Sequence, residues 1–118
     1  FDYAEYQRLL RELLGKGAES MIALEAKEGK YDLSAHAARL EIILEHWDDI
    51  LAIISQEIPS MQTLDQIFDT IAAPKTLPQI GIDEALLPAI FRATKDIRDK
   101  YVLSRLAWDL GIEDALLA

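Results

Sequence analysis

The sequence predicts an all-α protein, a multi-helix bundle that forms one domain over residues 1–118. Apolar residues recur at spacings of three and four along most of the chain, which is typical of amphipathic helices. No segment shows the strict apolar–polar alternation of a half-buried strand. Apolar residues make up 51% of the 118 residues, enough for one buried core. We therefore expect helices packed on one another and joined by short connections.

The first two helices are predicted from an apolar stripe and from the glycines that follow it. Gly15 and Gly17 break or bend the first helix. A second helix is expected over Ala18–Glu28, with Gly29 placed to end it in a left-handed conformation. The stripe of the first helix consists of Tyr3, Tyr6, Leu10, Leu13 and Leu14.

The longest predicted helix follows a capping residue, either Asp32 or Ser34, and ends at Pro59. Its periodicity continues without interruption, so we expect one continuous central helix. Ile42 and Ile53 form a second apolar line, which predicts contacts with neighbours on two sides. The main apolar line consists of Leu40, Ile43, Leu44, Trp47, Leu51 and Ile54.

A shorter helix is predicted next, and an irregular stretch follows it. Thr63 and Gln66 match a capping box, and the helix is expected to end near Ala73. Residues 72–83, AAPKTLPQIGID, hold two prolines and a glycine and are therefore expected to be irregular.

The remaining helices are predicted from caps and breakers near the end of the chain. Asp83 can cap a helix that either begins near Leu87, with Pro88 in its first turn, or bends at Pro88. Two further helices are expected over Tyr101–Leu110, ended by Gly111, and over Glu113–Leu117.

The charge distribution limits the classes of partner. A net charge of -9 argues against broad nucleic-acid binding. One segment, Arg92–Arg105, runs against this trend with five bases and two acids, and it has two interpretations. It meets an anion, or it is a solvated helix face on which Arg92 pairs with Asp96 four residues on. Lys95 and Asp99 have the same spacing.

The two histidines do not predict a metal site. On one continuous helix His36 and His46 would lie about 15 Å apart along the axis, too far to share an ion. His36 lies on the apolar stripe one turn before Leu40, so it is interpreted as a packed, hydrogen-bonded residue or as one lining a cleft. His46 has Asp49 nearby, which favours surface pairing. No catalytic, cofactor-binding or metal-ligating residue is predicted in the chain itself.

The other clusters also have structural interpretations. Four acids on the long helix (Glu41, Glu45, Asp48 and Asp49) are expected to form its solvent-facing side. Four aromatic residues lie at helical spacing from aliphatic residues and are expected in the core. These are Trp47, Phe68, Phe91 and Trp108.

Several absences bear on location. The chain has no cysteine, no signal-like segment and no apolar run of the roughly 18 residues that a membrane span needs. We therefore expect no membrane insertion and a cytoplasmic protein. The first methionine is Met21, so the natural start is expected upstream of Phe1.

Five segments, in this order and spacing, carry a resemblance to a known family. They are MIALEAKEGKYD, HAARLEIILEHWDDILAI, EIPS, AAPKTLPQIGID and TKDIRDKYVLSRLAWDLG. Together they resemble the C-terminal helical domain of the sn-glycerol-1-phosphate dehydrogenases, in the iron-containing alcohol dehydrogenase and dehydroquinate synthase-like group. None of the five is a catalytic signature by itself.

The resemblance implies an oxidoreductase of phospholipid biosynthesis. Its members reduce dihydroxyacetone phosphate with NADH or NADPH, and they bind a divalent metal, usually zinc. An N-terminal nucleotide-binding domain holds the cofactor, and the metal ligands, an Asp and two His, belong to segments that would precede this chain. His36 and His46 do not match those ligand motifs.

The chain alone is therefore expected to be inactive, with no cofactor of its own. Its expected partners are the missing N-terminal domain and further copies in a homo-oligomer. Lys95, Arg98 and Tyr101, with His36, are the candidates for residues nearest the cleft or a subunit interface.

Two alternatives remain open. The chain is a stand-alone helical protein-interaction domain derived from that family, or it belongs to a related member with another substrate. A stand-alone domain predicts a monodisperse protein that melts cooperatively. A part of a larger enzyme predicts an exposed apolar face where the missing domain packs.

Overall fold

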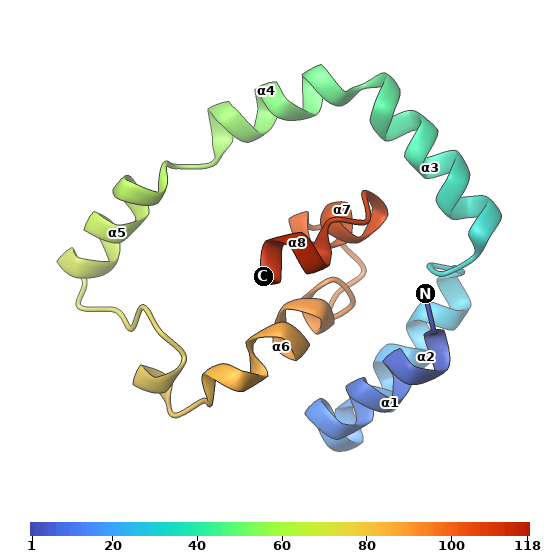
Figure 1. The fold of residues 1–118 in the computed structure, drawn as a ribbon, viewed down its shortest axis with the longest axis horizontal. Coiled ribbons are helices and arrows are strands. Elements are labelled where there is room, and N and C mark those ends of the chain that lie inside the picture. The colour runs from blue at the N-terminus through green and yellow to red at the C-terminus, as the bar shows by residue number, and fades with distance from the viewer. The chain divides into compact units, whose positions relative to one another are not determined.

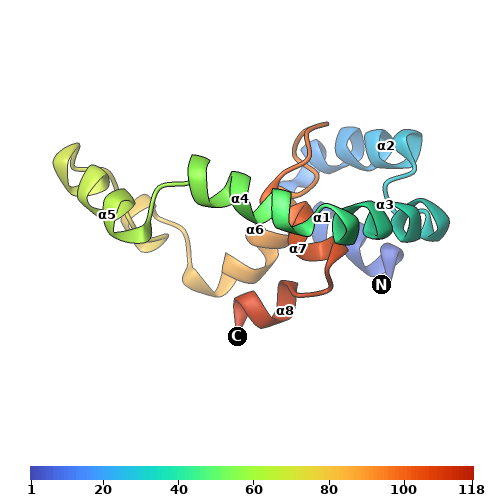
Figure 2. The same cartoon turned by 90° about the horizontal axis from the view of Figure 1, so that it is seen from above.

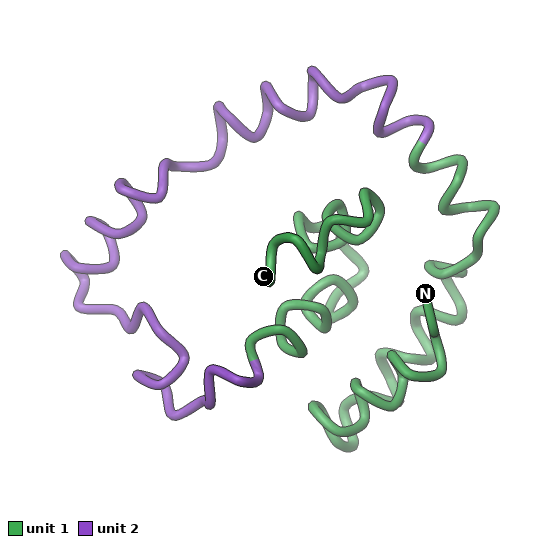
Figure 3. The backbone as a smooth tube through the Cα atoms, in the orientation of Figure 1, with its two compact units in different colours: residues 1–40, 87–118 green, residues 41–86 purple.

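The computed structural model describes all 118 residues and contains only helices, turns and loops (Figure 1). The all-α prediction is confirmed. The chain forms two compact units, shown in different colours in Figure 3: unit 1 comprises Phe1–Leu40 and Leu87–Ala118, and unit 2 comprises Glu41–Leu86. The α-helices are α1 (Tyr3–Leu14), α2 (Ala18–Glu28), α3 (Leu33–Glu45), α4 (Trp47–Glu57), α5 (Met61–Thr70), α6 (Leu87–Thr94), α7 (Leu103–Asp109) and α8 (Glu113–Leu117).

The first two helices form as predicted. Asp2 caps α1, because its Oδ1 accepts a hydrogen bond of 2.9 Å from the backbone N–H of Glu5. A 3-10 turn at Gly15–Gly17 joins α1 to α2. Gly29 ends α2 at a φ of 61°, a left-handed conformation that glycine adopts without steric cost.

The apolar core of unit 1 lies between α1, α2 and α6. Leu10 and Ala18 are completely buried there, and burying a leucine side chain contributes about 2–3 kcal/mol. The other members of this cluster are Tyr6, Met21, Ile22 and Ala93. Helix α6 also contacts α7, and α7 contacts α8, so the last three helices are tied to the same core.

The long central helix predicted from the sequence is in fact two helices. The backbone leaves the helical conformation at His46, with φ −105° and ψ 21°, so α3 ends at Glu45 and α4 begins at Trp47. Asp48 and Asp49 lie in the first turn of α4, where negative charge stabilises a helix N-terminus. The apolar periodicity runs through His46 without interruption, so it gave no indication that a new helix begins at Trp47.

The predicted burial of these two helices is also wrong. Ile42 and Ile53 are each 60% exposed, so the second apolar line has no neighbour. Ile43 is the one buried residue of unit 2. Phe68, predicted in the core, is exposed, and the other three aromatics of that set are half-buried: Trp47, Phe91 and Trp108.

Helix α5 is capped by a different residue from the one predicted. Ser60 has extended backbone geometry, and its Oγ accepts a hydrogen bond of 3.1 Å from the N–H of Thr63. Thr63 thus lies inside the first turn rather than before it. The helix ends at Thr70, ahead of the predicted Ala73, and the following stretch is irregular apart from a 3-10 turn at Pro78–Ile80.

The last part of the chain departs from the prediction in one respect that shapes the site. Helix α6 begins at Leu87 with Pro88 in its first turn, as the first of the two alternatives predicted, and α8 has the predicted bounds. Helix α7 begins only at Leu103, so residues 95–102 form turns and loop instead of helix.

No helix of the chain has both the length and the apolar character needed to cross a membrane.

Candidate functional site

The basic segment after α6 is a loop that turns part of its charge into the interior of unit 1. Because α6 ends at Thr94, the two predicted pairs at helical spacing do not form. Arg92 instead pairs with Asp114 at 2.7 Å, and Asp96 turns inward and is completely buried. The interpretation of this segment as a solvated helix face is therefore wrong.

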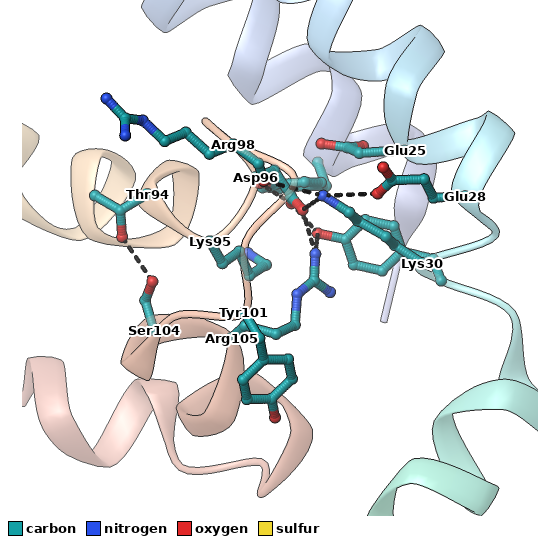
Figure 4. A network of polar contacts seen from close by, with 12 residues as sticks. Glu25, Glu28, Lys30, Thr94, Lys95, Asp96, Arg98, Tyr101, Ser104 and Arg105 are labelled. Atoms are coloured by element: carbon teal, nitrogen blue, oxygen red, sulfur yellow. Dashed lines mark hydrogen bonds and ion pairs between the residues drawn. The ribbon is translucent and has the colours of Figure 1, made fainter. Parts of the chain in front are cut away.

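Asp96 is the centre of a buried polar network. Its carboxylate accepts hydrogen bonds from the Tyr6 hydroxyl at 2.8 Å, from the Tyr31 hydroxyl and from Nη2 of Arg105. The ammonium of Lys30 lies 3.8 Å away (Figure 4). A buried carboxylate needs such partners, because an unpaired charge in the interior is strongly unfavourable.

Arg105 is held from several sides and keeps one donor free. Its guanidinium lies over the rings of Tyr31 and Trp108, at 4.8 and 5.2 Å from the ring centroids. The side chain is only 5% exposed. Its Nη2 is bonded to Asp96, but its buried Nη1 has no hydrogen-bond partner. A buried, unsatisfied guanidinium N–H is costly and is a ready donor for an anion.

Lys95 is buried as well. Its Nζ donates a hydrogen bond of 2.7 Å to the carbonyl oxygen of Arg92 and lies 4.1 Å from the centroid of the Tyr6 ring. Oε1 of Glu113 is 3.5 Å from the same nitrogen. Burial lowers the pKa of Lys95 from its ordinary value, and the carboxylate of Glu113 opposes that shift.

A second carboxylate, Asp109, organises the neighbouring side of unit 1. Arg39 donates two hydrogen bonds to it, of 2.8 and 2.7 Å, and Tyr101 donates one of 2.6 Å. Burial favours a raised pKa of Asp109, but these hydrogen bonds outweigh it and hold the pKa below its usual value. The pKa of Tyr101 is raised by burial and by Asp109.

His36 is a packed, hydrogen-bonded residue, as one of its two interpretations predicted. Its Nε2 lies 3.1 Å from the carbonyl oxygen of Asp109, and its ring lies 4.8 Å from that of Trp108. It also lines a hollow beside Tyr31 and Leu33, so the two interpretations of His36 are not exclusive.

The cations of these two clusters meet at a small pocket of about 150 Å³. Five of the seven lining side chains are basic, one is acidic and one is a tyrosine. Such a set of donors can hold a small anion through charge-assisted hydrogen bonds. The lining residues are Lys30, Arg39, Lys95, Asp99, Lys100, Tyr101 and Arg105.

The four candidates from the sequence fall at different places relative to this pocket. Lys95 and Tyr101 line it, and His36 reaches it only through Asp109. Arg98 is exposed, and Figure 4 shows its side chain directed away from the network. Only its carbonyl oxygen takes part, accepting a hydrogen bond of 3.3 Å from Lys30.

Sequence reasoning missed the other basic lining residues as a set. Arg105 and Lys100 belong to the basic segment that was noticed, so their charge was the available signal. Lys30 and Arg39 come from the first forty residues, and no local pattern links them to a segment more than fifty residues away.

Glu25 is the one buried acid with no cation bonded to it. It is 1% exposed; its Oε2 accepts a hydrogen bond of 3.1 Å from Tyr3, and its Oε1 has no partner. Burial and the nearby charge of Asp96 raise the pKa of Glu25 to about 7. This carboxyl therefore titrates near neutral pH.

The chain does not supply a site for the divalent metal that the family resemblance implies. No three His, Cys, Asp or Glu side chains are grouped so that they could hold a metal ion. His36 faces a carbonyl oxygen, and His46 makes an exposed contact of 3.4 Å with Asp49.

Comparisons with known proteins give no match. No protein-family model matches the chain, and neither the curated proteins nor the solved structures include one that is significantly similar. The resemblance to the dehydrogenases therefore stays a prediction. The segment that closes the resemblance, residues 94–111, does supply five of the seven pocket residues: Lys95, Asp99, Lys100, Tyr101 and Arg105.

Proposed function

We propose that this chain is the C-terminal helical part of an NAD(P)-dependent, metal-dependent sn-glycerol-1-phosphate dehydrogenase, and that it is not catalytic alone. The observation that supports the proposal most directly is the basic pocket of unit 1. It is an anion-type site, and most of it comes from the last of the five segments that carry the family resemblance. In this proposal the pocket receives the phosphate group of dihydroxyacetone phosphate.

The chemistry of the pocket suits a phosphate monoester. A phosphate oxygen in it would accept charge-assisted hydrogen bonds from Lys30 and Lys100, which line it. Nη1 of Arg105 is buried and has no partner in the protein, so it would join them only if the side chain turned toward the pocket. A hydrogen bond to a charged group contributes about 1.5–3 kcal/mol, so two or three of them suffice for specific binding.

The cations of the pocket are already balanced by carboxylates. Arg105 pairs with Asp96, Arg39 with Asp109, and Lys100 lies 3.6 Å from Asp99. The pocket therefore binds an anion through directed hydrogen bonds rather than through a net positive field. We expect its affinity to depend only weakly on ionic strength.

In the proposed enzyme, the residues of this chain take no part in the hydride transfer itself. A bound nicotinamide would supply the hydride in the complete enzyme. The residues here bind and orient the substrate phosphate, and the metal site would be formed elsewhere in the enzyme.

The first test is the reading frame upstream of Phe1, followed by an assay of the complete protein it encodes. A frame with a glycine-rich nucleotide-binding segment and an Asp/His/His set supports the proposal. A start codon within a few residues of Phe1 contradicts it.

The second test uses two substrates that differ only in the phosphate. Lys100 is 73% exposed, so Lys100→Ala should fold normally. We expect it to raise the KM for dihydroxyacetone phosphate about tenfold and to leave that for dihydroxyacetone unchanged. Lys16→Ala, at an exposed position outside the pocket, is the matched control. An equal change for both substrates would remove the pocket from phosphate recognition.

A stand-alone helical interaction domain is the second candidate. Residues 41–86 expose many large apolar side chains, which suit a surface for a partner protein in this candidate and a surface for the missing domain in the complete enzyme. This candidate predicts that the 118-residue chain is monodisperse, melts cooperatively and does not bind inorganic phosphate.

A further inference from the structure

Helix α5 has an apolar stripe that is only partly covered: Ile67 is 45% exposed, Phe68 38%, and Leu64 is half-buried. The stripe is formed by residues at spacings of three and four, so all of them lie on one side of the helix. Met61 is 81% exposed and Ile71 is 66% exposed, at the two ends of the stripe. Between them lie Leu64, Ile67 and Phe68.

Helices α3 and α4 also expose large apolar side chains. Ile42 is 60% exposed, Leu44 61% and Ile53 60%. Within unit 2 no pair of helices makes an extensive contact, and Figures 2 and 3 show α4 and α5 following one another rather than stacked. A run of exposed large apolar residues of this extent is rare unless another molecule covers it.

The same unit carries nearly all the excess negative charge of the protein. Residues 41–86 contain nine acids and one base, a net charge of −8, whereas the rest of the chain contributes −1 to the total of −9. The one base, Lys75, is already paired with Asp65 and Asp69, each at 2.7 Å. Of the other acids of the unit, only Asp49 has a basic neighbour within it, His46 at 3.4 Å.

This combination decides what can cover the surface. Unit 2 of a second copy would bring a charge of −8 against −8, which opposes association of like faces. An anionic membrane surface would be repelled for the same reason. A helix with one apolar side and a border of lysine or arginine would bury the stripes and pair with the acids.

We propose that the acidic apolar surface of unit 2 (residues 41–86) is a docking site for a basic amphipathic helix of a partner protein. The apolar side of that helix lies on the stripe of α5 and on the exposed Ile53 of α4. Its basic side chains contact the carboxylates that border them, such as Asp48 and Asp49 in the first turn of α4. This inference rests on unit 2 alone; in the proposed complete dehydrogenase the missing domain is the competing occupant of this surface.

The test uses the 118-residue chain and three fluorescent peptides of about 14 residues, roughly four helical turns. The first peptide places leucine on one side and lysine on the other. The second replaces each lysine with glutamate, and the third shuffles the first so that no apolar side remains. Fluorescence anisotropy gives the affinity of each.

We expect the lysine peptide to bind at least about tenfold more tightly than the other two. Its affinity should fall several-fold between about 0.05 and 0.5 M salt, because exposed charges are screened at high salt. The variants Met61→Asp and Ile53→Asp should each weaken binding about tenfold. The control is Leu33→Asp in unit 1, at a position that is 82% exposed, which should leave binding unchanged.

Three results would overturn the inference. Equal affinity for the lysine and glutamate peptides would remove charge from the recognition. Binding that Met61→Asp does not weaken would place the peptide away from α5. Sedimentation that shows a dimer of the chain, dissociated by Met61→Asp, would make a second copy the occupant of this surface. Circular dichroism of each variant separates loss of binding from loss of helix.

Discussion

Unit 1 buries charged side chains, whereas unit 2 leaves large apolar side chains exposed. The buried residues of unit 1 include Glu25, Lys95, Asp96, Arg105 and Asp109. Unit 2 buries only Ile43, although its helices are at least as apolar. Amphipathic character in a sequence therefore predicts a helix and its sidedness, but not whether that side is covered.

The difference follows from the range of the contacts in each unit. Unit 1 is held by pairs that are far apart in sequence, such as Tyr6 with Asp96 and Arg39 with Asp109. Side-chain hydrogen bonds in unit 2 join near neighbours, such as Ser60 with Thr63 and Lys75 with Asp65. Distant contacts close a core, while local ones only shape helix ends and turns.

The strongest way to break this contrast is to remove the cation at the centre of unit 1. Arg105→Leu leaves the carboxylate of Asp96 buried without its main partner, so we expect the free energy of unfolding to fall by about 3–5 kcal/mol. Urea denaturation measures the change. Arg8→Leu, which breaks an exposed pair with Glu5, should have little effect. Equal losses in the two variants would mean that the buried network does not stabilise unit 1.

The pH dependence of the free energy of unfolding should report the titration of Glu25, the buried acid of unit 1 that has no cation bonded to it. The folded pKa of Glu25, about 7, lies above the ordinary value of 4.5. Between these two values the unfolded chain releases a proton that the folded chain keeps, so stability falls as pH rises through this window. The full effect is roughly 3 kcal/mol.

Glu25→Gln imitates the protonated acid and should flatten this dependence. We expect the variant to match the natural chain at pH 5 and to exceed it in stability at pH 8. Thermal or urea denaturation at both pH values measures the change, with the exposed Glu12→Gln as control. Asp109 does not confound the test: its pKa is lowered, so its contribution is lost only as the solution becomes more acidic than about pH 4. A variant with the same pH profile as the natural chain would contradict the raised pKa.

In unit 2 the substitution with the largest effect on local stability should be one that removes a helix cap. Ser60→Ala removes the side-chain oxygen that accepts from Thr63, which costs about 1 kcal/mol and is felt within α5. Hydrogen exchange of the α5 amides should quicken about fivefold. Thr63→Ala is the informative comparison, because it separates the cap in the structure from the one expected from the sequence. A greater effect for Thr63→Ala would reverse the assignment.

The smallest expected effect comes from an exposed methionine of the same unit. Met61→Ser should change the free energy of unfolding by less than about 0.5 kcal/mol, since the side chain is 81% exposed. Met21, at 8% exposure in the core of unit 1, is its matched counterpart. Met21→Ser should cost about 2–4 kcal/mol in the same urea titration. Similar values for the two methionines would erase the contrast between the units.

The local features of the fold were predictable because short signals determine them. Gly29 ends α2, Asp32 accepts from the N–H of Ala35 at the start of α3, and Pro88 lies in the first turn of α6. The break at His46 was not predicted, because the apolar period runs through it unchanged.

The candidate site was predictable only in part. The sequence predicted a basic segment and, within it, the site residues Lys95 and Tyr101. It also predicted that the segment is helical, whereas residues 95–102 form turns and loop. A loop after Thr94 turns Asp96 inward, and only the folded chain brings Lys30 and Arg39 to the pocket next to that loop. The exposure of the apolar side chains in unit 2 could not be predicted from the sequence either, because it depends on which helix surfaces pack together in the fold.

The bond between Tyr6 and Asp96 has a consequence for biosynthesis. Ninety residues separate its two ends, so α1 and α2 leave the ribosome long before the residues that complete their core exist. During that interval the helices of unit 2 are made with their apolar side chains already open to solvent or to a chaperone. Closing such a long loop costs little more than closing one half its length, so the delay is set by translation rather than by the search for the contact. Synonymous codons that slow translation after Leu86 should therefore lengthen the time in which the nascent chain is prone to aggregate.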